Sequence, residues 1–308
     1  DARNNYYYKN YGLYAQATYK FTEQLSVTAG IRNTWDWEKE TANNVKDGLS
    51  PAFESKPRPI EAVVCVDVPG NDNLMLLPGH IGLAEYETTL GVAQELSGSL
   101  LPLRNTPGAI RFLLDETAAA YNADFVIVDM SPSLGPINQN LLATSDHFVV
   151  PLHPDYFSAM ALSSLAKALP RWQQWAETAY GVDVLANADY PFPKPHSTFV
   201  GSVIQKYRPR NGRASQAFQH WIDQLVEGLK TTLVPALEKS KMLDSVDFKA
   251  RSGLDPWTPL LEVQDFNSLI AYSQQFQVPV FALTEAQLNQ GGAVWAQTKE
   301  LMDAFAKS

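Results

Sequence analysis

The hydrophobic pattern of the chain changes at about residue 46 and again at about residue 61. Between residues 11 and 32, apolar and polar residues alternate, and the alternation is broken only by a short polar stretch at residues 22–24. A period of two residues predicts two β-strands joined by a tight turn, so we expect residues 1–45 to contain a β-hairpin. Residues 46–60 contain three prolines and have no clear periodicity, which indicates a linker.

From residue 61 onward, short apolar runs alternate with longer amphipathic stretches. The runs predict strands buried on both faces of a sheet, at residues 62–68, 74–77, 125–128, 148–152, 199–204 and 278–283. The stretches predict helices at residues 83–96, 108–121, 137–144, 157–180, 214–237, 265–275 and 292–305. This alternation is typical of an α/β fold with a mostly parallel sheet and helices on both faces. We therefore expect residues 61–308 to form one α/β domain.

Composition narrows the class of protein. Apolar residues make up 45% of the 308 residues and charged residues 19%, as in soluble globular proteins, which excludes wholesale disorder. The net charge of −9 argues against a protein coated in nucleic acid, although a local basic patch is compatible with it. The only cysteine, Cys65, excludes an internal disulfide and is expected in the core. No apolar run is long enough for a transmembrane helix, and because the sequence starts at Asp1, we expect the natural start elsewhere.

The residues best placed for chemistry follow the apolar run at 125–128. That run ends in Asp129, and the turn Ser131-Pro-Ser-Leu-Gly135 precedes the next predicted helix. Phosphoryl-transfer enzymes use a carboxylate at a strand end to hold the magnesium shell. A turn of small residues also allows backbone N–H groups to approach a phosphate. The alternative is that Asp129 merely caps the turn.

These motifs together make residues 61–308 similar to the ParA/MinD-type partition ATPases, a family with a deviant-Walker P-loop NTPase fold. The resemblance rests on Asp129 and its turn, and on Asn138 and Asn140 in the helix that follows. Three further segments match the family pattern, namely Pro151-Leu-His-Pro154, Asn73–His80 and Pro279–Leu283. No single motif is specific, but the combination is.

The resemblance implies ATP and Mg²⁺ as cofactors. It implies that Asp129 is catalytic and holds the magnesium ion through water. It also implies nucleotide contacts from Ser131, Pro132, Gly135, Pro154, Asp155 and Gln205. The family mechanism further implies a cytoplasmic homodimer, without membrane contact for residues 61–308, that binds nonspecific DNA. A partition-complex partner protein would release this dimer during plasmid or chromosome segregation.

One defining motif of that family is missing from the sequence. The P-loop pattern Gly-x-x-x-x-Gly-Lys-[Ser/Thr] occurs nowhere, and the aspartate of the family's second strand is also missing. The sequence therefore looks like an N-terminally truncated family member, and we expect no meaningful ATP hydrolysis. The alternative is a nucleotide-free pseudo-ATPase that acts as an interaction module.

The first 45 residues resemble a different family. The segment Asn10–Arg32 is similar to two strands of a TonB-dependent outer-membrane receptor. A fragment of such a receptor is therefore a third interpretation, but it explains only the first 45 residues. A soluble amphipathic hairpin is the alternative. Two strands cannot close a barrel, so we expect the apolar face of the hairpin to pack poorly or promote aggregation. Because outer-membrane receptors and cytoplasmic ATPases share no compartment, a chimeric chain from a misjoined reading frame is one explanation.

A basic stretch is the remaining candidate for binding. Residues 192–222 contain no acidic residue, and DNA binding is predicted for Lys206, Arg208, Arg210 and Arg213. The alternative is a solvated basic loop, or one that faces an acidic partner. His147 and His153 flank one predicted strand, but no carboxylate or cysteine lies at ligand spacing, so a metal site there is not expected.

Overall fold

The computed structural model describes most of the chain between residues 13 and 288. The described residues are 13–22, 25–33, 44–55, 58–68, 73–95, 101–207, 209–210, 213–214, 216–266 and 268–288, with Trp295 and Lys299. For residues 13–33 and 206–217 the description is limited to the backbone. The helix predicted at 292–305 thus lies largely outside the described residues.

The described part of the chain contains both helices and strands. The α-helices are α1 (Val45–Phe53), α2 (Ala84–Glu95), α3 (Thr106–Ala120), α4 (Pro136–Thr144), α5 (Tyr156–Tyr180), α6 (Asp183–Ala186), α7 (Gln216–Gly228), α8 (Val234–Lys239), α9 (Ser245–Ser252), α10 (Ser268–Phe276) and α11 (Glu285–Leu288). The strands are β1 (Leu13–Thr22), β2 (Leu25–Asn33), β3 (Val66–Asp67), β4 (Met75–Leu76), β5 (His147–Leu152), β6 (Thr198–Tyr207), β7 (Pro209–Arg210), β8 (Arg213–Ala214) and β9 (Leu261–Gln264). A π-helical turn, η3 (Leu229–Leu233), joins α7 to α8, and the 3₁₀ turns are η1 (Ile81–Leu83), η2 (Leu101–Leu103) and η4 (Val280–Ala282).

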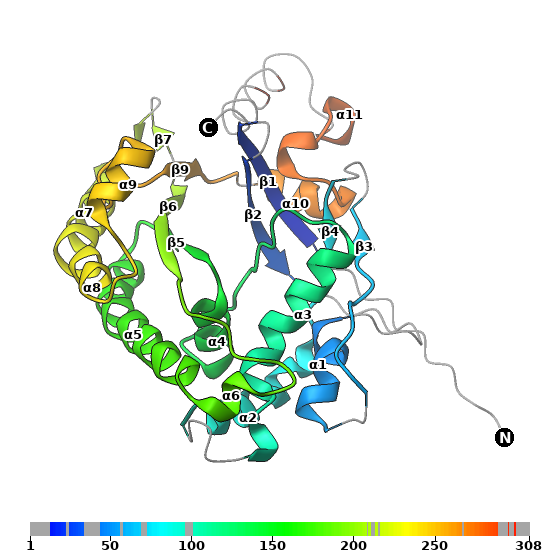
Figure 1. Ribbon diagram of the computed structural model, residues 1–308. Helices are drawn as coiled ribbons and strands as arrows, with labels where there is room; N and C mark the ends of the chain where they lie inside the picture. Colours follow the sequence, from blue (N-terminus) through cyan, green and yellow to red (C-terminus); the bar gives the residue numbers. More distant parts are fainter. Residues whose placement is uncertain are drawn as a thin grey trace.

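A three-stranded parallel sheet with the order β5-β6-β9 forms the framework of the α/β part. Its register places Leu152 of β5 beside Ile204 of β6, and Ile204 beside Glu262 of β9. Leu152 and Ile204 are buried in one apolar cluster with Trp172 of α5 and Leu229 of η3, so α5, α7 and α8 cover this face of the sheet (Figure 1). The parallel sheet with its helices confirms the predicted α/β fold class.

The segment predicted as a linker, residues 46–60, begins with a helix instead. The side chain of Asn44 caps α1 at its N-terminus, and α1 places Leu49 in a second apolar cluster beside Leu113 of α3. Both leucines are fully buried. The linker expectation is therefore wrong for α1. Pro51 lies inside this short helix and masked its periodicity, because proline is otherwise a sign of loops.

Several apolar runs predicted as strands have little or no strand pairing. The run at 62–68 contributes only β3, which pairs with β4 in an antiparallel arrangement. Residues 125–128 belong to none of the sheets that the described residues form, and Phe125, Val126 and Ile127 are 49–54% exposed. The run at 278–283 contains the turn η4, and the sequence did not predict β9. An apolar β-branched run favours an extended backbone. A β-sheet also requires a partner strand, and the apolar pattern of one run does not indicate which segment that partner is.

The hairpin predicted near the start of the chain is present. β1 and β2 pair in an antiparallel ladder that runs from Leu13 opposite Asn33 to Thr22 opposite Leu25. They form a sheet of their own that is not joined to β5-β6-β9, and β1 lies beside α10 and η4 (Figure 1). Because the side chains of β1 and β2 lie outside the description, the receptor resemblance and the poor packing stay predictions.

An irregular segment at residues 187–197, here called the crossing segment, leads from α6 to β6 over the start of α3. Its Tyr190 and Phe192 are buried, and the hydroxyl oxygen of Tyr190 accepts a hydrogen bond of 2.8 Å from the Ile60 N–H. The backbone of Tyr190 and Pro191 passes so close to Gly108 that a methyl group there would overlap it. The absence of a side chain at Gly108 thus allows this crossing.

Candidate functional site

Asp129, which was predicted to hold magnesium through water, is exposed directly after the apolar run at 125–128. The turn that follows leads directly into α4, which starts with Pro136 at its first helical position and has Gly135 as its N-cap residue. Proline at this position needs no hydrogen-bond partner and has the φ angle of a helix, so it fixes where the helix begins. Ser131 and Pro132 are exposed, and Gly135 is half-buried. This turn and the carboxylate are therefore accessible to a ligand.

Asn138 holds the turn in its conformation. Its side-chain amide donates hydrogen bonds to the carbonyl oxygens of Ser131, at 2.5 Å, and Ser133, at 2.7 Å. Only 2% of Asn138 is exposed, and burial in such a position requires satisfied hydrogen bonds. The sequence identified Asn138 only as part of a family motif. Its role as a clamp on the turn was not predicted, because it depends on how the turn folds back over the first turn of α4.

A carboxylate from a neighbouring helix lies against the end of the turn. Glu87 of α2 packs so closely against Gly135 that a methyl group at this glycine would overlap its Oε1 atom. A negative charge near the N-terminus of α4 is stabilising because it interacts favourably with the helix dipole. The same charge opposes the binding of a phosphate at that point. Glu87 is a feature of the site that the sequence did not predict.

A second group of predicted residues lies near the carboxyl ends of β5 and β6. Leu152, the last residue of β5, is in register with Ile204, so Pro154, Asp155 and Gln205 share one edge of the parallel sheet. This is the edge at which ligands bind in open parallel sheets. Pro154 is buried, whereas Asp155 and Gln205 are half-buried. Nucleotide contact by these three residues stays a prediction.

Asp155 has a structural role as the N-cap residue of α5. Its Oδ1 atom accepts a 2.7 Å hydrogen bond from the Ser158 N–H, and its Oδ2 atom lies 3.0 Å from Nδ1 of His153. Burial on its own raises the pKa of Asp155, but the hydrogen bonds with Ser158 and the attraction of His153 outweigh it and lower the pKa below 3.8. Both carboxylate oxygens are thus engaged within the protein.

The Asp155→Ala variant is expected to lower the free energy of unfolding by about 1 kcal/mol at pH 7, because α5 loses its cap. A carboxyl group with a lowered pKa stabilises the fold above its unfolded-state pKa and loses this effect as the pH falls through its folded-state pKa. The difference between wild type and Asp155→Ala should therefore shrink below about pH 4. Urea denaturation at several pH values measures it. Asp155→Asn, which retains a cap oxygen, should stay near wild type at pH 7, and a loss equal to that of alanine would contradict the capping role.

The donor set at Asp129 fits only a magnesium ion that is held mainly by water. In the part of the chain that the structure describes, no three His, Cys, Asp or Glu side chains gather as metal ligands. Mg²⁺ keeps several waters and binds through one or two carboxylates plus phosphate oxygens. One exposed carboxylate beside a serine-containing turn is compatible with such contact through water.

The predicted DNA-binding residues follow the end of β6. Lys206 lies in β6, and Arg210 of β7 pairs with Arg213 of β8 in a short antiparallel hairpin. Arg208 and the side chains of the other three residues lie outside the described residues. DNA binding by this basic stretch therefore stays a prediction.

The surroundings of Trp172, Cys65 and His147 do not indicate a functional site. Trp172 is 2% exposed within the main core. Cys65 is only half-buried rather than in the core, and burial raises the pKa of its thiol, which disfavours the reactive thiolate. His147 lies 2.6 Å from the Thr198 hydroxyl through its Nδ1 atom. Among the described helices, none is long and apolar enough to cross a membrane.

The sequence itself places the chain in a family. The sequence model of the AAA domain family matches residues 23–179, just over half of the chain, and the chain belongs to this family. The match covers α1 to α5, including Asp129 and the turn after it. It starts at residue 23, well before residue 61, where the resemblance to partition ATPases was expected to begin.

Proteins of similar sequence include two that are named Soj. The chain is 28% identical over 157 residues to the chromosome-partitioning ATPase Soj of Treponema pallidum, and 26% identical over 165 residues to the sporulation initiation inhibitor protein Soj of Bacillus subtilis. Each match covers 48% of this chain, and 57% and 58% of the two relatives. An uncharacterized protein of Methanocaldococcus jannaschii, MJECL24, is 34% identical over 90 residues, 29% of each chain. The chain is thus similar to the Soj proteins at low identity, and it spans little more than half of their length.

One solved structure is also similar. The crystal structure of protein DIP2308 from Corynebacterium diphtheriae is 21% identical, covers 62% of this chain and 66% of that protein, and has a TM-score of 0.45.

Proposed function

We propose that residues 61–308 serve as the nucleotide-switch part of a ParA-type partition ATPase. The observation that carries this proposal is the exposed Asp129 followed by the turn that Asn138 clamps onto α4. A turn held in this way presents its backbone in a fixed conformation, and a fixed backbone is what recognition of a phosphate requires. Membership of the AAA domain family and the two Soj relatives support the same class.

We further propose that the chain with this sequence does not turn over ATP. The sequence contains no Gly-x-x-x-x-Gly-Lys-[Ser/Thr] motif, whose backbone and lysine cradle the phosphates in P-loop enzymes. Glu87 beside Gly135 adds a negative charge where α4 begins, which opposes a phosphate there. Magnesium positioned by Asp129 would therefore lack the cradle that normally holds its phosphate ligands.

Phosphate release from Mg-ATP by the purified chain tests this proposal. We expect wild type, Asp129→Ala and Asp124→Ala to release phosphate at the same background rate. Asp124 is the matched control because it is exposed at the other end of the same extended run. Magnesium-dependent turnover in wild type and Asp124→Ala that disappears in Asp129→Ala would show that the chain is an active ATPase.

The second candidate is an interaction module that binds no nucleotide. It is favoured by exposed apolar residues, because the consecutive residues Phe125, Val126 and Ile127 are about half exposed. A contiguous exposed apolar surface is typical of a protein interaction site. Magnesium-dependent binding of a fluorescent ATP analogue separates the two candidates, since only the first retains it. The first candidate also includes three proposed interactions. These are the formation of a homodimer, the binding of nonspecific DNA and the binding of a partition-complex partner protein.

A further inference from the structure

The crossing segment needs anchors because it has no regular secondary structure and contains three prolines. At its start, the Asp189 N–H donates a 3.0 Å hydrogen bond to Oδ1 of Asn105, whose amide donates to the Asp189 carboxylate at 2.7 Å. The hydroxyl oxygen of its buried Tyr190 accepts a hydrogen bond from the Ile60 N–H. None of these three hydrogen bonds involves a histidine.

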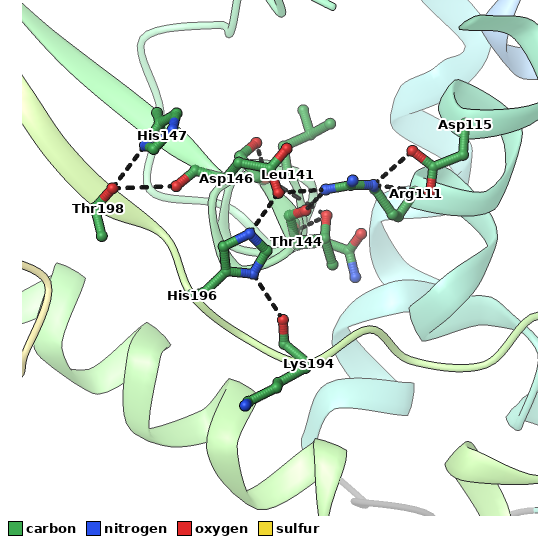
Figure 2. Close-up of polar contacts among 11 residues, drawn as sticks. Arg111, Asp115, Leu141, Thr144, Asp146, His147, Lys194, His196 and Thr198 are labelled. Carbon is green, nitrogen blue, oxygen red and sulfur yellow. Dashed lines mark hydrogen bonds and ion pairs between the residues drawn. The ribbon is translucent and has the colours of Figure 1, made fainter. Parts of the chain in front are cut away.

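At the other end of the crossing segment, just before β6, His196 connects the segment to Asp146. Its Nε2 atom lies 2.6 Å from Oδ1 of Asp146, and its Nδ1 atom lies 3.0 Å from the carbonyl oxygen of Lys194 (Figure 2). Both partners only accept hydrogen bonds. A neutral imidazole has one N–H, so it can make one of these two bonds, whereas the imidazolium can make both. The arrangement is complete only when His196 is protonated.

Asp146 is held in place from the opposite side. Arg111 of α3 approaches its Oδ1 atom at 3.3 Å and donates a 2.6 Å hydrogen bond to the carbonyl oxygen of Thr144, at the end of α4. The Nε atom of Arg111 also donates to Asp115 at 2.7 Å (Figure 2). The contacts with Thr144 and Asp115 fix the position of Arg111. Arg111 in turn holds the Asp146 carboxylate in its orientation toward His196.

In the part of the chain that the structure describes, five charged or titratable residues belong to the same group of contacts as His196. They are Arg111 and Asp115 on α3, Asp146 and His147 at the start of β5, and Lys194 in the crossing segment (Figure 2). His147 is hydrogen-bonded to Thr198 of β6, which also donates a 3.3 Å hydrogen bond to the Asp146 carbonyl oxygen. Thus Asp146 is the acid that His196 contacts directly.

We propose that His196, Asp146 and Arg111 form a pH-sensitive clasp that holds the C-terminal end of the crossing segment against α3 and the start of β5. With His196 protonated, both ring nitrogens are bonded and the clasp is closed. On deprotonation, one of the two bonds is lost and the attraction to Asp146 disappears, so the segment opens more often. The effect is modest, because the side chains of His196 and Asp146 are 58% and 49% exposed.

Amide hydrogen exchange of the full chain tests this clasp. We expect the protection factors of amides in residues 192–198 to fall about two- to fivefold between pH 5.5 and pH 8.0, as the loss of an exposed ion pair predicts. In His196→Gln these protection factors should equal the wild-type value at pH 8.0 at both pH values. The matched control is His220→Gln, which changes an α7 histidine in edge-to-face contact with Trp221 and should keep the wild-type response.

Two results would overturn the clasp. One is an unchanged protection factor in wild type across this pH range, and the other is a pH response that persists in His196→Gln. Asp146→Asn provides an independent check, since it retains an oxygen acceptor but loses the charge. It should reduce the pH response to less than half of that in wild type, and a full response in this variant would exclude Asp146 as the partner of His196.

Discussion

Replacing Gly108 by alanine is expected to destabilise the protein by about 3 kcal/mol, one of the largest effects of any single methyl group in this chain. The added Cβ atom would overlap the carbonyl oxygen of Tyr190 and would lie 2.6 Å from that of Pro191. These are backbone atoms, so they cannot rotate away as the end of a flexible side chain could. The crossing segment would have to lift from α3, which would expose Tyr190 and Phe192. Urea denaturation followed by tryptophan fluorescence measures the change.

Gly181→Ala is the matched control for this experiment. Gly181 has an ordinary φ of −79°, and a Cβ atom there would meet its nearest atom, the carbonyl oxygen of Thr178, at 3.5 Å. The free energy of unfolding should therefore change by less than about 0.5 kcal/mol. If Gly108→Ala were as mild as Gly181→Ala, the crossing segment would not be seated on α3 as described.

Leu49→Ala should cost about 3 kcal/mol, within the range measured for buried leucines. Leu49 is fully buried on α1 beside Leu113, so its truncation leaves a cavity between two helices. This result would show that α1 is part of the core rather than a linker. The free energy of unfolding is again the quantity measured, from urea denaturation curves.

The same substitution at an exposed position provides the comparison. Leu101 is 63% exposed, so Leu101→Ala removes the same atoms without opening a cavity. We expect a change of less than about 0.5 kcal/mol for this variant. Equal costs for Leu49→Ala and Leu101→Ala would mean that α1 does not contribute to the core.

The sequence predicted the helices between residues 83 and 180 well. The structure has α2 at Ala84–Glu95 where 83–96 was expected, and α5 at Tyr156–Tyr180 where 157–180 was expected. Their signals are local, because the apolar residues recur at helical spacing and Asp155 provides a cap directly before α5. The hairpin of β1 and β2 was predicted for the same reason, from a period of two residues within one short segment.

The candidate site was predicted in part. Asp129, its turn and the helix after it are contiguous in the sequence, so the sequence could identify them. The roles of Asn138 and Glu87 were not predictable, since each depends on which backbone atoms the folded turn places beside them. The strand pairing of the run at 125–128 was also predicted incorrectly, because a ladder depends on a second segment.

The sequence by itself determined the α/β class, the hairpin, most of the helices and the motif at Asp129, because each is a property of neighbouring residues. The tertiary structure alone decided that α1 is part of the core, that the crossing segment runs over Gly108, and that Asp146 faces His196. In these cases the partners are distant in the chain, as with Arg111 and Asp146, which are 35 residues apart. Such contacts form only when packing of the apolar clusters brings the segments together, and no local pattern specifies them.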